Sequence, residues 1–144
     1  AETKRYQEEG LKLLSGKVDS LPSKIAFRPK FIKQSSCIKV FDKLYLFISK
    51  ANIKKPLEER FDALFHEIGH WLHFQNIPPL KECREVWKNA NLEKIKEDVS
   101  EYAVKKDDGR EFVAEVFKGL VKGKKYDEYI MNLYKRLHGP IPHD

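Results

Sequence analysis

"FDALFHEIGHWLHF", residues 61–74, places three histidines and one glutamate among large apolar side chains. The apolar residues in and just before this stretch recur at helical spacing and predict one buried helix face; they are Leu57, Phe61, Leu64, Phe65, Ile68 and Leu72. At about 100° per residue, the three histidines project away from the centre of that face. The pattern predicts a helix that opens at Pro56 and ends before Pro78 and Pro79.

"HEIGH", residues 66–70, is a His-Glu-x-x-His motif within this predicted helix. Residues four positions apart on a helix are about 5–6 Å from each other, so the imidazoles of His66 and His70 can bind one ion. Glu67 follows the first of them and is placed to act on a water molecule beside the ion. Zinc is the metal that such a nitrogen-rich, tetrahedral and open site favours.

A third protein ligand has to come from another position. His73 lies one helical turn beyond His70, and histidines at i, i+4 and i+7 cannot all reach one tetrahedral ion without distortion. Glu111 and Glu115 in "REFVAEVF" are also four residues apart and share a helix face. One of them could bind zinc while the other accepts a hydrogen bond from a ligand histidine. The alternative is that both lie on the exposed face of an amphipathic helix.

The rest of the chain reads as a small sheet followed by helices. "RYQEEGLKLLSG" predicts a short helix ended by Gly16, and "DSLPSKIAF" predicts a loop that enters a strand. "CIKVF" and "LYLFIS" predict a hairpin, or two strands of one sheet. Further helices are expected in "LKECREVWKNANLEKIKEDVSEYAV", with a break near Asn89–Asn91, and then in "REFVAEVFKGLV" and "YDEYIMNLYKRL". This order predicts an α+β fold, and 144 residues suit a single domain spanning 1–144.

Composition and charge exclude some classes of protein. A hydrophobic content of 41% is too high for a disordered chain, and no apolar run approaches the roughly 18 residues of a membrane span, so we expect no membrane partner. Residues 1–60 carry 14 Lys and Arg against 7 Asp and Glu. This excess could attract nucleic acid, but no nucleic-acid-binding motif accompanies it, and a solvated lysine-rich face is the favoured interpretation.

"HEIGH" together with the downstream stretch "SEYAVKKDDGREFVAEVF" resembles the gluzincin metallopeptidases. The likeness is strongest to the catalytic domain of anthrax lethal factor and its relatives, including the secreted Pro-Pro endopeptidases. That family shows Ser-x-Tyr followed by Glu-Phe-Phe-Ala-Glu-x-Phe. The resemblance covers residues 44–117 or so. It implies a zincin-like fold with a small mixed sheet, an active-site helix and a helical C-terminal half.

The resemblance implies a role for each matched residue. His66, His70 and Glu111 would be the zinc ligands, Glu67 the general base, and Tyr102 the residue that faces the substrate carbonyl. Glu115 matches the second acidic position and would hold a ligand histidine. The implied activity is that of a zinc-dependent metalloendopeptidase, in which a water activated by the metal hydrolyses a peptide bond.

Two positions depart from the family pattern. Val113 stands where the family has its second phenylalanine, which is a change of packing only. Tyr102 precedes Glu111 by nine residues, a longer gap than in the family, and the extra residues fall in the turn "KKDDG". Insertion into such a turn is tolerated, so the zinc assignment is kept.

The substrate is expected to be a peptide or protein that adds to the sheet along the edge strand "KLYLFIS". Lys39, Lys43 and Lys50 surround this strand in the sequence and favour acidic residues in the substrate.

Two other functions stay open from the residues. One is a binding module with a structural zinc, whose fourth ligand would be His73, Tyr102 or His138. The other is a virion-associated or basic nucleic-acid-binding domain, in which residues 1–60 act and HEIGH is incidental.

Overall fold

The computed structural model describes residues 2–21, 26–27, 36–40, 43–48, 50–75 and 79–143. Its α-helices are α1 (Glu2–Leu14), α2 (Asp62–Gln75), α3 (Leu80–Lys88), α4 (Leu92–Asp98), α5 (Arg110–Val121) and α6 (Glu128–Arg136). Two short 3-10 helices are η1 (Lys50–Lys54) and η2 (Tyr102–Val104). The strands are β1 (Ala26–Phe27), β2 (Ser36–Val40) and β3 (Lys43–Ile48).

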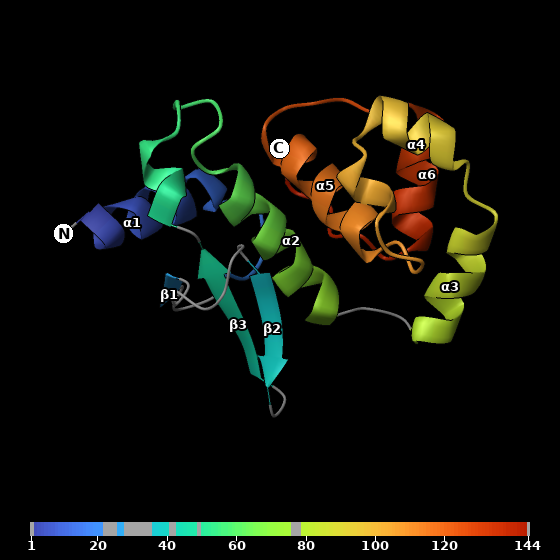
Figure 1. The fold of residues 1–144 in the computed structure, drawn as a ribbon, viewed down its shortest axis with the longest axis horizontal. Coiled ribbons are helices and arrows are strands. Elements are labelled where there is room, and N and C mark those ends of the chain that lie inside the picture. The colour runs from blue at the N-terminus through green and yellow to red at the C-terminus, as the bar shows by residue number, and fades with distance from the viewer. Residues whose placement is uncertain are drawn as a thin grey trace.

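Helix α2 runs through the middle of the molecule (Figure 1). The sheet, α1 and η1 lie on one side of it, and α5 with the other C-terminal helices lies on the opposite side. Helix α2 contacts α5 over much of its length and also contacts β2 and β3. The helix with the histidines is therefore covered on two sides.

The strands form one small sheet in the order β1-β3-β2. β2 and β3 pair antiparallel with Ile38 opposite Tyr45, which confirms the expected hairpin, and β1 pairs parallel to β3 with Ala26 opposite Phe47. The strand expected at the edge, β3, is thus the central strand with a hydrogen-bonded neighbour on each side. A peptide cannot add where β1 or β2 already pairs, so the prediction that substrate binds along β3 as an edge strand was wrong.

The expected α+β class also needs correction. Helices make up most of the described residues, whereas the strands are short and lie together to one side of the helices (Figure 1). The described chain is predominantly helical, and its sheet is a small element that packs against α2. The sequence prediction gave the sheet too large a share of the fold. The apolar, β-branched runs are confined to a few residues around 36–48, and such short runs form only short strands.

Helix α2 starts later than its sequence suggests. Pro56 was expected to open it, but α2 begins at Asp62. The residues before Asp62 form turns, in one of which the Glu59 amide donates to the Pro56 carbonyl at 2.9 Å. Contacts with α1 hold these turns, since the Tyr6 hydroxyl donates to the Arg60 carbonyl at 2.8 Å. Leu57, expected on the buried face, is 68% exposed. Pro78, expected beyond the helix end, lies outside the described residues.

The later helices follow the predicted pattern more closely. The expected break is confirmed, because α3 ends at Lys88 and α4 begins at Leu92. The Asn91 side chain caps α4 by accepting a hydrogen bond from the Lys94 amide at 3.1 Å. Helices α5 and α6 coincide with the two predicted C-terminal helices.

Helices α2 and α5 approach each other most closely at Gly69. A Cβ atom at this position would lie 3.2 Å from the Cα of Ala114 and 3.1 Å from Cδ2 of Phe117. Two small residues therefore allow the two helix backbones to cross with little space between them. Around this crossing Ile68, Phe112 and Phe117 are fully buried and form part of the core.

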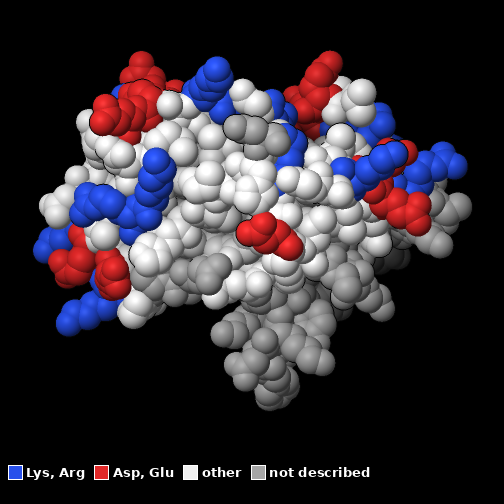
Figure 2. Space-filling model, turned by 180° about the vertical axis from the view of Figure 1, so that it is seen from behind, with Lys and Arg blue, Asp and Glu red and all other residues white. Residues whose placement is uncertain are grey.

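The surface carries charges of both signs. On the face seen in Figure 2, Lys and Arg side chains alternate with Asp and Glu side chains, and the described part of this face has no patch of a single sign. The basic surface that nucleic-acid binding requires is therefore not found on the described part of this face. Among the described helices, none combines the length and the apolar character that crossing a membrane would take.

We expect Gly69→Ala to lower the free energy of unfolding by about 1 kcal/mol, because overpacking costs about 1–3 kcal/mol and the better helix propensity of alanine offsets about 1 kcal/mol of it. Chemical denaturation of the metal-free protein measures the change. An increase in stability would contradict the close helix crossing.

Candidate metal centre

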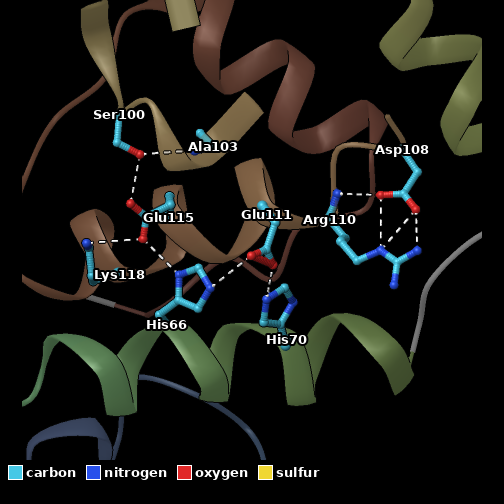
Figure 3. A network of polar contacts seen from close by, with 9 residues as sticks. All are labelled: His66, His70, Ser100, Ala103, Asp108, Arg110, Glu111, Glu115 and Lys118. Carbon is cyan, nitrogen blue, oxygen red and sulfur yellow. Dashed lines mark hydrogen bonds and ion pairs between the residues drawn. The ribbon is translucent and has the colours of Figure 1, made fainter. Parts of the chain in front are cut away.

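Two imidazoles from α2 face two carboxylates from α5 across the helix crossing (Figure 3). His66 and His70 stand one turn apart on α2, and Glu111 and Glu115 stand one turn apart on α5. Glu111 is only 6% exposed and Glu115 only 7%. The alternative that these glutamates lie on an exposed amphipathic face is therefore wrong.

The carboxylate of Glu111 lies between the two imidazoles. One of its oxygens contacts Nε2 of His70, and the other is 3.6 Å from Nε2 of His66. The same nitrogen of each ring thus points toward one carboxylate. Two imidazole nitrogens and one carboxylate from a neighbouring helix form the His2Glu donor set that catalytic zinc takes in proteins.

Glu115 fixes the orientation of the His66 ring. Its Oε2 lies 2.8 Å from Nδ1 of His66, so that Nδ1–H donates to the carboxylate and Nε2 points toward Glu111. Burial alone would raise the pKa of Glu115, but the hydrogen bond and charge of His66, with Lys118 and Ser100, bring it down to about 2. Glu115 therefore stays ionised and acts on the ring rather than as a proton carrier.

Ser100 and Lys118 hold Glu115 in turn. The Ser100 hydroxyl donates to Oε1 of Glu115 at 2.7 Å and accepts the Ala103 amide at 3.2 Å, and Nζ of Lys118 lies 3.1 Å from Oε2. The residues around Tyr102 are thereby linked through Ser100 and Glu115 to the imidazole of His66 (Figure 3).

Glu67 is a second carboxylate close to the imidazoles. One ligand atom each from His66, Glu67 and His70 lies within 4.8 Å of the others, so Glu67 competes with Glu111 as a third ligand on distance alone. Glu111 is favoured because its two oxygens reach both rings, one each. Burial raises the pKa of Glu67 to about 7. The negative charges of Glu111 and Glu115 also raise this pKa, whereas the charge of His66 lowers it. A carboxyl group with that pKa can both take and release a proton near neutral pH.

Tyr102 stands at the mouth of the centre. Its ring centroid is 5.3 Å from that of His66, with the rings close to perpendicular, and the residue is 37% exposed. Burial and the carboxylates of Glu111, Glu67 and Glu115 raise the pKa of the phenol to about 12. The hydroxyl therefore keeps its proton and acts as a hydrogen-bond donor, with Glu111 as its acceptor in this structure.

His73 does not join this centre. Its Nε2–H donates to the Leu137 carbonyl at 2.8 Å, and the residue is 1% exposed in the core. The ring is thus bound to the end of α6, and the idea of His73 as a zinc ligand was wrong. His138 is exposed just after α6, in the left-handed region with φ of 62°.

The pKa values of the two candidate ligand histidines shift in opposite directions. Burial lowers the pKa of His66, but hydrogen bonds to Glu111 and Glu115 more than compensate and raise it to about 9. Burial dominates at His70 and lowers its pKa, despite its bond to Glu111. Among the described residues, the buried Nδ1 of His70 has no hydrogen-bond partner. The residues fit a divalent cation, since Nε2 of both imidazoles faces the buried carboxylate of Glu111, and Glu115 adds a second negative charge on the far side of the His66 ring.

The turn before α5 sets the direction of the Glu111 side chain. Asp108 is 2% exposed, and its Oδ1 accepts the Arg110 amide at 3.1 Å while Oδ2 accepts Nε of Arg110 at 2.9 Å. Gly109 has φ of 79°, in the left-handed region that glycine adopts without strain.

A pocket of about 430 Å³ opens beside the centre. Its walls include His66, Glu67, Tyr102 and Glu115 of the centre, and Lys55 of the segment before α2. A cleft of this size that reaches His66 and Glu67 gives a small molecule or a peptide side chain access to this edge of the centre.

Three residues of the site received no role from the sequence. Ser100 belongs to the quoted Ser-x-Tyr stretch, but only the fold shows that its hydroxyl meets Glu115. Lys118 stands three residues after Glu115, a spacing that could have indicated the pair. Lys55 carried no signal, since its place in the pocket follows from the turns before α2.

Comparison of the chain with protein-family models, with curated proteins and with solved structures found no match in any of the three.

We expect Glu115→Ala to weaken zinc binding by about 10- to 100-fold, because the His66 ring loses the carboxylate that orients it. Ser100→Ala should change zinc affinity in the same direction by less, and Ser100→Thr, which keeps the hydroxyl, serves as its control. Competition with a chromophoric chelator measures the affinities. If Glu115→Ala stripped the metal while Glu111→Ala only weakened it, the two assignments would be reversed.

His73 is expected to make the fold sensitive to acid. Burial lowers its pKa from 6.5 to about 4, so the unfolded chain binds a proton between these values that the folded chain does not. The contribution of the neutral ring to the free energy of unfolding is fully present above pH 6.5 and is lost as the pH falls toward about 4. The loss amounts to roughly 3 kcal/mol. Denaturation of the metal-free protein at several pH values, with His73→Gln as the reference, measures this difference. Equal slopes for both proteins would rule it out.

Proposed function

We propose that the protein is a zinc-dependent metallopeptidase that hydrolyses peptide bonds. The observation that carries the proposal is the meeting of Nε2 of His66, Nε2 of His70 and the carboxylate of Glu111 at one buried point beside an open pocket. Structural zinc sites are closed by a fourth protein ligand, whereas catalytic sites use three and keep one position for water or substrate. The pocket beside the centre favours the second arrangement.

His66, His70 and Glu111 would hold the ion, and Glu115 would keep His66 in the tautomer that leaves Nε2 free to bind. Zinc bound there supplies a Lewis acid that makes water a nucleophile at neutral pH and polarises a carbonyl group. The donor set of two imidazoles and one carboxylate suits zinc better than calcium or magnesium, which prefer oxygen ligands throughout.

Glu67 is the residue suited to move the proton. Its pKa of about 7 means that its carboxylate can accept a proton from the attacking water and that the acid formed can give it to the leaving amine. Its place next to His66 on α2 keeps it within the same pocket wall. Peptide hydrolysis needs both transfers, so one group that does both is sufficient.

Tyr102 is the residue suited to stabilise the developing negative charge. Its phenol keeps its proton up to a pKa of about 12 and lines the pocket that contains Glu67. A hydroxyl donor aimed at the oxygen of a tetrahedral intermediate is typically worth about 10²- to 10³-fold in rate. The likeness of "HEIGH" and "SEYAVKKDDGREFVAEVF" to the gluzincins adds support from the sequence.

Substitutions in the motif test the proposal. Glu67→Gln should keep zinc and abolish cleavage, because the amide cannot accept the proton. Tyr102→Phe should keep zinc and slow turnover by about 10²- to 10³-fold, and His66→Ala should lose zinc. Elemental analysis of the purified proteins and cleavage of a proteome-derived peptide library provide the two measurements.

His73→Gln is a matched control, because it changes a histidine of the same helix that is bound in the core instead of at the centre. It should retain both zinc and cleavage. Zinc-free wild-type protein after purification at neutral pH, or a Glu67→Gln protein as active as the wild type, would overturn the proposal.

A further inference from the structure

The pocket beside the candidate centre has walls from both sides of α2. Ala51, Asn52 and Lys55 come from η1 and the residues after it, Asp62 and Ala63 come from the first turn of α2, and Lys118 comes from α5. Ala51 and Ala63 are small, so these walls leave room for a side chain beside His66 and Glu67. The character of that side chain depends on the charged groups in the pocket.

Most charged groups of the pocket are already paired within the protein. Nζ of Lys118 lies 3.1 Å from Glu115, and the carboxylate of Asp62 is 2.6 Å from Nζ of Lys122. For Lys55, in contrast, no ion pair is found among the residues that the structure describes. Its ammonium group is thus the positive charge of the pocket that is available to a ligand.

The sequence that precedes Lys55 is basic. Residues 22–55 contain nine Lys and Arg against one Asp, whereas the whole chain has a net charge of +6. A basic segment of this kind favours anionic ligands over cationic ones.

We propose that Lys55 makes this pocket a subsite for an acidic side chain, so that the protein selects peptides with aspartate or glutamate near the cleaved bond. This inference rests on the proposed peptidase function. The ligand carboxylate would pair with the ammonium of Lys55 while the neighbouring backbone reaches Glu67 and Tyr102. Lys55 is thereby a specificity-determining residue and takes no part in the chemistry.

The test uses two series of peptides. One series varies only the residue before the scissile bond, and the other varies only the residue after it. In each series the varied residue is glutamate, glutamine or lysine. The wild-type protein should show the highest kcat/KM for glutamate. Lys55→Gln should lower the ratio of kcat/KM for the glutamate and glutamine peptides by about fivefold, the value of a partly exposed ion pair, and the change should appear in KM. Lys55→Glu should favour the lysine peptide.

Lys54→Glu is the matched control. Lys54 is the exposed neighbour of Lys55 at the end of η1 and does not line the pocket, so the same change of charge should leave the ratio close to that of the wild type. Equal rates for the three peptides in the wild type, or equal shifts for Lys54→Glu and Lys55→Glu, would overturn the inference.

Binding separates this inference from the peptidase proposal. Zinc-loaded Glu67→Gln protein should bind the glutamate peptide more tightly than the lysine peptide in fluorescence anisotropy, and added salt should reduce the difference. If no peptide is cleaved but this Lys55-dependent preference remains, the peptidase proposal fails and the subsite stands. If peptides are cleaved without the preference, the subsite fails alone.

Discussion

The close crossing of α2 and α5 is the contact on which the candidate centre depends. Gly69 on α2 and Ala114 on α5 leave so little side chain between the helices that a Cβ at Gly69 would lie 3.2 Å from the neighbouring backbone. Each helix alone carries only half of the site, imidazoles on one and carboxylates on the other (Figure 3). Because the glycine is part of HEIGH itself, the motif contains both the candidate ligands of α2 and the small residue that lets α5 approach them.

Stability alone does not account for this arrangement. Burying carboxylates and imidazoles is unfavourable unless they are paired, and apolar residues of similar volume would hold two helices together at least as well. The protein compensates with a chain of partners, in which His66 bonds Glu115 and Ser100 and Lys118 support that carboxylate. A buried cluster with such shifted pKa values beside an open pocket is characteristic of a functional site.

The structure brings His66 and His70 of α2 next to Glu111 and Glu115 of α5, as the sequence predicted, because each pair is tied to local periodicity. The spacing of His66 and His70 and of Glu111 and Glu115 follows from the helical repeat, and α5 coincides with its predicted span. Prediction from the sequence failed where contacts with distant segments determine the position of a side chain. His73 shares a helix with the ligands, but the Leu137 carbonyl, 64 residues away, binds it instead.

The same limit applies to the sheet and to the start of α2. Whether a strand is central or at an edge depends on β1. A strand was expected at the end of "DSLPSKIAF", but its two-residue pairing with β3 could not be read from the local pattern. Pro56 suits a first helical position, but contacts with Tyr6 of α1 keep the residues after it in turns. Those turns also bring Lys55 to the pocket, a placement that nothing in the local sequence pattern indicated.

The positions of Glu111 and Tyr102 are fixed by separate contacts, one on each side of the turn that ends at Gly109. The aim of Glu111 is set by the left-handed glycine and by Asp108 bound to Arg110, immediately before the helix. The register of Tyr102 is set upstream by the Ser100 hydroxyl on the Ala103 amide. Residues between these two anchors can be gained or lost in evolution while both side chains keep their places, so the tyrosine-to-glutamate interval is a poor signature of kinship for proteins built this way.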